Sequence, residues 1–213
     1  MRPLNSADFV YLLNGLKWTI GLSLSALILG GIIAALLVTL RLFRSTAVNT
    51  ALFGYVSLFQ GTPLLGQLLF FYFGLSILGL DVPPFVAATV AMSFYAAAFL
   101  SEIWRGSIDA IQYHQWEASE SLGLGRLQTL TNVILPQAMR AATPPTVGFL
   151  VQLIKDSSLA TVLGFVELTR AAQLVNNATF RSFTIFGTIA VLYFALCFPL
   201  TLWSRRLERS VAH

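Results

Sequence analysis

The amino-acid sequence predicts an all-α integral membrane protein with about five transmembrane helices, and three observations support this fold class. Of its 213 residues, 56% are hydrophobic and only 10% are charged, whereas soluble globular proteins carry roughly 25% charged residues. The mean hydropathy is +0.76. Several uncharged intervals reach the roughly 20 residues that a helix needs to cross a bilayer. The composition therefore excludes a soluble globular domain and, because so few residues are charged, a disordered chain.

Uncharged intervals predict the first two crossings. Residues 18–40 carry no charge and form the first one. Residues 45–80 are also uncharged, but they are too long for one simple crossing and contain Gly61-Thr62-Pro63. Because proline removes a helical hydrogen bond and clashes with the preceding turn, a continuous helix is not expected through this motif. We expect a short helix, a break, and then a span from about Pro63 to Leu78.

The other three crossings lie on either side of a long hydrophilic segment. Residues 82–101 supply the third crossing and residues 182–204 supply the last. Between them, residues 141–154 are apolar but short, and Lys155-Asp156 follows directly. We expect a fourth helix that continues past this charged pair. The chain is then one transmembrane domain, residues 1–213, with spans at about residues 15–42, 50–80, 83–105, 137–164 and 182–205.

Small residues recur in the first predicted span. Ala26, Gly30 and Ala34 lie four residues apart and would share one helix face. Such a face allows close packing against another helix. A general abundance of small residues in membrane helices explains the spacing equally well.

Basic residues predict the orientation in the membrane. Lys and Arg number 13 against 9 Asp and Glu, which gives a net charge of +4. In a membrane protein this excess indicates cytoplasmic loops near anionic lipid rather than nucleic-acid binding. The basic residues at 41–44, 105–140 and 205–209 fall on one side of five crossings. We therefore expect the N-terminus outside and the C-terminus in the cytoplasm.

The only long hydrophilic stretch lies between the third and fourth crossings, over residues 102–140. Its centre, residues 115–123, predicts a short helix that ends at Gly123 in the left-handed conformation. Trp116 and Leu122 give this helix apolar anchors, and Ser121 lies on its polar flank. A helix this short is marginal in water, so it must dock on something. The alternative is a helix that lies on the membrane surface with Trp116 at the interface.

This stretch resembles the EAA loop of ABC-importer permeases, which reads Glu-Ala-Ala, three residues, Gly, nine residues, Ile-x-Leu-Pro. The chain has Glu117-Ala118-Ser119, then Gly123, then Val133-x-Leu135-Pro136. Three further motifs resemble those of the polar amino-acid permeases (the histidine, glutamine, glutamate, arginine and cystine type): residues 59–65, residues 101–106 and residues 155–159. Two departures are Gln60, where the family has Arg, and residues 112–114, where it has Pro-x-Gly.

The resemblance implies the transmembrane domain of a type I ABC importer, a permease subunit in the bacterial inner membrane. Its implied partners are two ATPase subunits, a second permease subunit (itself or a paralogue), a periplasmic or lipid-anchored solute-binding protein, membrane lipid and a polar amino acid. A coupling loop over residues 109–133, extending to Pro136, would carry motion from the ATPase. The expected coupling residues are Glu117, Ala118, Ser121, Leu122 and Gly123.

Ionisable residues inside a predicted span are candidates for substrate binding, because burying them in lipid is costly. Lys155 and Asp156 are neighbours that point about 100° apart on a helix, and Ser157 and Ser158 add hydroxyls. Asp156 could meet the ammonium group of an amino acid and Lys155 its carboxylate. The break at Gly61, Thr62 and Pro63 would add free backbone groups, as discontinuous helices do in other transporters. Two alternatives to substrate binding are equally compatible with Lys155 and Asp156: they could lie at the outer membrane interface, or they could form structural links between helices.

Enzyme motifs are missing from the sequence. There is no Gly-x4-Gly-Lys-[Ser/Thr] loop for nucleotide phosphates, no serine elbow and no His-Glu-x-x-His. Two histidines and one cysteine make no plausible metal set. We expect no catalytic residue, no metal and no cofactor. The alternative function is a secondary carrier or channel subunit that uses Lys155 and Asp156 for ion coupling.

Overall fold

Helices form the whole architecture of the computed structural model, which describes residues 2–41 and 45–211. No strand occurs within these two ranges, which confirms the all-α prediction. Residue 42, where the first crossing is expected to end, lies outside the described residues. The elements in chain order are α1 (Ser6–Arg41), α2 (Thr46–Gly61), α3 (Leu64–Ile77), α4 (Pro84–Asp109), α5 (Tyr113–Ser121), α6 (Arg126–Thr129), the π-helix η1 (Leu130–Ile134), α7 (Leu135–Asp156), the 3-10 helix η2 (Ser157–Leu163), α8 (Leu168–Thr179) and α9 (Ser182–Val211).

Four of these helical segments are long and apolar enough to cross a membrane. They are α1, α4, the continuous segment Arg126–Leu163 and α9. The α2–α3 pair satisfies the same test only jointly, and it is bent by 103°. The bend follows from Pro63, which cannot donate a helical hydrogen bond. The break lies at the expected motif, but α3 has only 14 residues, so the segment after the break is too short to be a crossing by itself.

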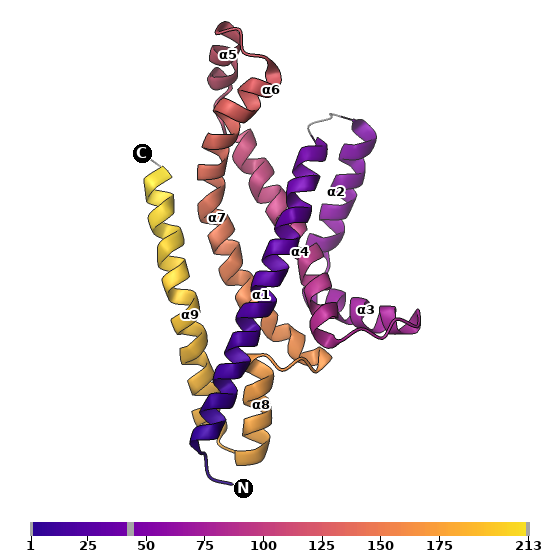
Figure 1. The fold of residues 1–213 in the computed structure, drawn as a ribbon, viewed down its shortest axis with the longest axis vertical. Coiled ribbons are helices and arrows are strands. Elements are labelled where there is room, and N and C mark those ends of the chain that lie inside the picture. Colours follow the sequence, from indigo (N-terminus) through magenta and orange to yellow (C-terminus); the bar gives the residue numbers. More distant parts are fainter. Residues whose placement is uncertain (1, 42–44, 212–213) are drawn as a thin grey trace.

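The helices are arranged along one long axis (Figure 1). The C-terminal ends of α1, α4 and α9 lie toward the same end of the molecule as α5 and α6. The N-terminus and α8 lie at the opposite end, and α3 projects sideways. We call these the α5 end and the α8 end. Arg44 lies outside the described residues, and the other basic residues expected on one side of the membrane belong to elements that meet at the α5 end.

Helix α4 is the centre of the fold and packs on α1, α2, α3 and α7. Its contact with α1 is close because both faces carry small residues. Ala26 and Ala34 are fully buried, and a Cβ atom at Gly30 would lie 2.7 Å from Cβ of Ala96 and 2.8 Å from the Ser93 carbonyl oxygen. The small residues of α1 are thus a close-packing face, and composition alone does not explain them.

Candidate functional site

The short helix α5 ends as the sequence predicts, at a glycine in the left-handed region. Gly123 has φ +74°, and its N–H donates to the Glu120 carbonyl over 2.9 Å. The N–H of Leu124 donates to the Ser119 carbonyl over 3.1 Å. These bonds satisfy carbonyls that the last turn would leave free, while the Leu122 side chain stays 80% exposed. The loop is therefore held by its own backbone and presents an apolar side chain outward.

One face of α5 packs inward and the other remains open. Trp116 lines a hollow of about 300 Å³ together with Arg126, Leu127 and Leu130, so it faces α6 and η1, on which α5 packs. The Glu117 carboxylate is more than half exposed, and its nearest ionic partner is Nδ1 of His114 at 3.2 Å. Trp116 thus anchors α5 to its own chain, and the side with Glu117 is left accessible.

A single helical segment connects α5 with the charged pair predicted as a substrate contact. Residues Arg126–Leu163 form one continuous helix of 38 residues, of which η1 is a π-helical turn. Pro136 explains this turn, because its ring has no N–H for the preceding helical carbonyl, and π-turns inside helices are frequent at functional sites. Lys155 and Asp156 end α7 on the same segment.

Asp156 is half-buried and only partly paired. Its Oδ1 accepts a hydrogen bond of 2.8 Å from Nε2 of Gln152. Its Oδ2 is buried and has no hydrogen-bond partner among the described residues. Lys155 is exposed and makes no ion pair with its neighbour. The pair therefore does not neutralise itself, and one buried carboxylate oxygen is left without a hydrogen-bond partner among the described residues.

The two serines that follow are turned toward the backbone. The Ser157 hydroxyl is buried and donates to the Ile154 carbonyl over 2.7 Å. The Ser158 hydroxyl donates to the Lys155 carbonyl over 2.7 Å. Both hydroxyls shape the start of η2, the 3-10 helix that packs against α3.

Gln67, which sequence reasoning missed, closes the break between α2 and α3. Its Nε2 donates to the Phe59 carbonyl (2.8 Å), the Thr62 carbonyl (3.1 Å) and the Thr62 hydroxyl (2.9 Å). Its side chain is only 7% exposed, and its Oε1 has no partner in the described part of the chain. Backbone carbonyls expected to be free at Gly61, Thr62 and Pro63 are thus partly satisfied. An amide four residues after Pro63, in an otherwise apolar run, was the available signal.

A chain of ion pairs joins α1 to α4 toward the α5 end. Glu102 accepts from Arg41 over 2.8 Å and from Arg105 over 2.6 Å, and Arg105 also pairs with Asp109 over 2.6 Å. A cavity of about 440 Å³ is bordered by Arg41, Glu102, Arg105 and Gln60. Sharing Glu102 between two helices fixes the spacing of α1 and α4 at this level.

At the α8 end, hydrogen bonds at Glu167, a second residue missed by sequence reasoning, and at its neighbour Leu168 tie three helices together. Glu167 is fully buried and caps α8, since its carboxylate accepts from the N–H of Thr169 (2.7 Å) and of Arg170 (2.8 Å). The Tyr193 hydroxyl of α9 donates to it over 3.2 Å, and the Thr19 hydroxyl of α1 accepts from the Leu168 N–H over 3.1 Å. Burial raises the pKa of Glu167 above its ordinary value.

Comparisons with known proteins assign the chain to a family. A family model described as "Binding-protein-dependent transport system inner membrane component" matches residues 26–213. The glutamine transport system permease protein GlnP of Escherichia coli is 36% identical over 93% of this chain and 91% of its own length. The L-cystine transport system permease protein TcyB of Bacillus subtilis is 35% identical, over 93% and 87%.

Solved structures agree. An amino acid ABC transporter crystallised with histidines has a chain that is 28% identical, with a TM-score of 0.89 over 98% of this chain and 100% of that one. The MetNI methionine ABC transporter, in an inward-facing conformation, has the same fold at 20% identity and a TM-score of 0.81, over 98% of this chain and 99% of that one. By its sequence and its fold, this chain belongs to the family of binding-protein-dependent transport system inner membrane components.

Proposed function

We propose that this chain is the permease subunit of an ATP-driven importer that moves polar amino acids across the bacterial inner membrane. The relatives named above are amino-acid permeases. The observation that carries the proposal is the continuous helix from Arg126 to Leu163. It begins beside the exposed coupling helix α5 and contains the incompletely paired Asp156, so one helical segment, with Pro144 and Pro145 in its interior, joins the two proposed sites.

The proposed coupling site is the accessible side of α5 and its glycine turn. Two separate ATPase subunits would bind two permease subunits, each through Glu117, Ala118, Ser121, Leu122 and Gly123. The exposed Leu122 side chain supports this assignment, because a helix of nine residues needs a docking partner. With the α5 end in the cytoplasm, the C-terminus is cytoplasmic and the N-terminus and α8 face the solute-binding protein. The second permease subunit is a copy of this chain or a paralogue.

The proposed substrate pathway passes the end of α7. The unpaired Oδ2 of Asp156 is buried, so it would accept a hydrogen bond from the ammonium group of an amino acid only after a conformational change uncovers it. Exposed Lys155 would pair with the carboxylate of the amino acid. Ser157 and Ser158 fix the backbone that presents both side chains. The α2–α3 break at Gly61, Thr62 and Pro63 borders the same pathway through α3, which packs on η2.

Reconstitution tests this proposal. The chain, its ATPase and its solute-binding protein are placed in proteoliposomes, and uptake of radiolabelled glutamine, cystine and arginine is measured with and without internal ATP. We expect uptake only with all components and ATP. Glu117→Lys is expected to reduce uptake at least tenfold, whereas Glu208→Lys, the same charge change on an exposed site of α9, retains it. Uptake by this chain alone, driven by an ion gradient, would instead show a secondary carrier.

A further inference from the structure

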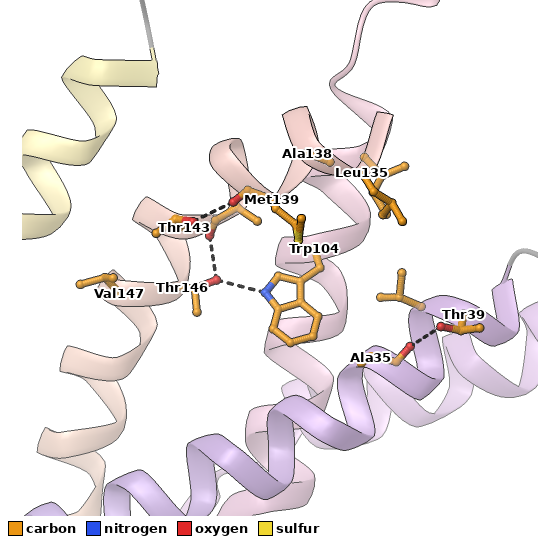
Figure 2. A pocket seen from close by; sticks show the side chains of 12 residues that line it. Ala35, Thr39, Trp104, Leu135, Ala138, Met139, Thr143, Thr146 and Val147 are labelled. Carbon is orange, nitrogen blue, oxygen red and sulfur yellow. Dashed lines mark hydrogen bonds between the residues drawn. The ribbon is translucent and has the colours of Figure 1, made fainter. Parts of the chain in front are cut away.

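A lateral groove lies between α1, α4 and α7, away from the groups assigned above. Its volume is about 480 Å³. Figure 2 shows Trp104 of α4 pointing between α1 and α7, with Ala35 and Thr39 on one side and Ala138, Thr143 and Thr146 on the other. Small side chains on both walls create the space that the indole ring does not fill.

The polar atoms along this groove are already paired within the chain. The hydroxyls of Thr39, Thr143 and Thr146 donate to the carbonyls four residues earlier, over 2.7–2.8 Å. The indole N–H of Trp104 donates to the Thr146 hydroxyl over 3.0 Å. A polar ligand would find few open hydrogen-bonding partners here, so an apolar occupant fits best.

The groove is long as well as apolar. It follows α7 from Leu135 to Val147, which is about 18 Å at the helical rise. One extended hydrocarbon chain can follow it over this length without needing a polar partner from its walls.

A cation lies next to the groove lining along α7. Arg140 does not itself line the groove, but it follows Met139 and precedes Thr143 by one turn, and both of these residues do. Its side chain is exposed and has no ion-pair partner in residues 2–41 and 45–211. Basic residues next to pockets between transmembrane helices suit lipid phosphates. We propose that the groove holds one acyl chain of a membrane phospholipid, in the leaflet at the α5 end, with Arg140 paired with its phosphate.

Quenching of tryptophan fluorescence by brominated lipid tests the acyl chain. The full-length chain carrying Trp18→Phe, Trp116→Phe and Trp203→Phe keeps only Trp104, and it is placed in phosphatidylcholine vesicles with or without bromine on the acyl chains. A reference chain keeps only Trp203, which is 51% exposed on α9. We expect Trp104 to be quenched as strongly as Trp203 although it is more enclosed. Quenching of Trp203 alone would mean that protein, such as a second copy, covers the groove, and would overturn the proposal.

A filling variant tests the groove itself. Thr143→Phe, at an exposed lining position, is expected to lower quenching of Trp104 at least twofold. Thr188→Phe is the matched control, because its hydroxyl also bonds to a carbonyl one turn back but lies on α9. Equal quenching of Trp104 in both variants would refute a lipid acyl chain in the groove. Circular dichroism and gel filtration verify that each variant is folded.

A charge variant tests the phosphate contact. With brominated phosphatidylglycerol as a minor component, Arg140→Gln is expected to lower Trp104 quenching about twofold. Arg181→Gln, between α8 and α9 at the other end of the molecule, should leave it unchanged. An unchanged signal in Arg140→Gln would exclude this arginine as the partner of the phosphate.

Discussion

Each end of this molecule carries a short helix beyond the membrane spans, α5 at one end and α8 at the other, and the two helices are held in place in opposite ways. Helix α8 is capped by fully buried Glu167 and bonded to α1 and α9. Helix α5 is closed by bonds within its own loop, and Leu122 beside its glycine turn stays 80% exposed. The hydrogen bonds and packing of α8 are supplied by its own chain, whereas α5 has one face that its own chain does not cover. Under the proposed function, the α5 end is the one that would receive another protein.

Gly123→Val is expected to give the largest effect, at the open end. A β-branched residue in the left-handed conformation at φ +74° costs at least about 1–2 kcal/mol, so the turn must change shape. No atom lies within 4 Å of the added Cβ, so the fold itself should persist. We expect at least a tenfold loss of uptake and of transport-linked ATP hydrolysis in the reconstituted complex, with unchanged membrane insertion.

Gly125→Val is the matched control for this change. Gly125 lies two residues away but has an ordinary φ of −66°, and its Cβ would be at 3.6 Å from the Gln128 side chain. We expect it to retain most of the activity. Full activity in Gly123→Val would show that the shape of the turn does not matter and that the contrast between the two ends has no functional meaning.

Asp156→Asn is expected to give an intermediate effect, at the far end of α7. The amide keeps the oxygen that accepts from Gln152 but loses the negative charge that a substrate ammonium group would meet. A charge-assisted hydrogen bond contributes roughly 1.5–3 kcal/mol. We therefore expect uptake to fall about tenfold. Lys155→Met should act in the same direction. Asp81→Asn, an exposed carboxylate before α4, is the control. Unchanged uptake and unchanged substrate-stimulated ATP hydrolysis in both variants would remove these residues from the pathway.

Glu167→Ala is expected to give the smallest effect on transport but a measurable one on stability. It removes the cap of α8 and leaves buried N–H groups unpaired, a loss of about 2 kcal/mol that corresponds to a melting temperature about 4–8 °C lower. A thermal melt of the purified chain in detergent measures it. Glu208→Ala removes a carboxylate from an exposed site of α9 and is the control. Equal melting temperatures for the two variants would show that the buried cap does not stabilise the α8 end.

The pH dependence of this stability has a defined sign. Burial raises the pKa of Glu167 above its ordinary 4.5. The contribution that its protonated carboxyl group makes to the free energy of unfolding is therefore fully present below pH 4.5, and it is lost as the pH rises through the raised pKa. Glu167→Gln should lack that dependence. Parallel pH profiles of the wild type and Glu167→Gln would show that the carboxyl group does not titrate as proposed.

The features that the sequence predicted are local ones. The break at Gly61-Thr62-Pro63 and the turn at Gly123 depend on the conformational limits of proline and the freedom of glycine, which act within a few residues. The spacing of Ala26, Gly30 and Ala34 likewise marks one face of one helix. Such rules need no knowledge of the rest of the chain.

The features that were missed depend on distant partners. The bond from the Leu168 N–H to the Thr19 hydroxyl joins residues 149 positions apart, so nothing near Glu167 in the sequence indicates that it is buried. The roles of Gln67 and the 103° angle between α2 and α3 likewise depend on which helices pack around them. Burial of a polar group is a property of the assembled fold, and a single sequence does not contain it directly.

The unbroken helix from Arg126 to Asp156 also has a geometric consequence. Its 31 residues extend over about 46 Å, so a tilt of about 10° around its middle would displace each tip by roughly 4 Å in opposite directions. A modest swing imposed at the cytoplasmic tip would thus be enough to change the width of a passage for an amino acid at the other tip. Transport would then need a tilt of this segment, with any bending concentrated at Pro144 and Pro145 inside α7, and no refolding of the helix.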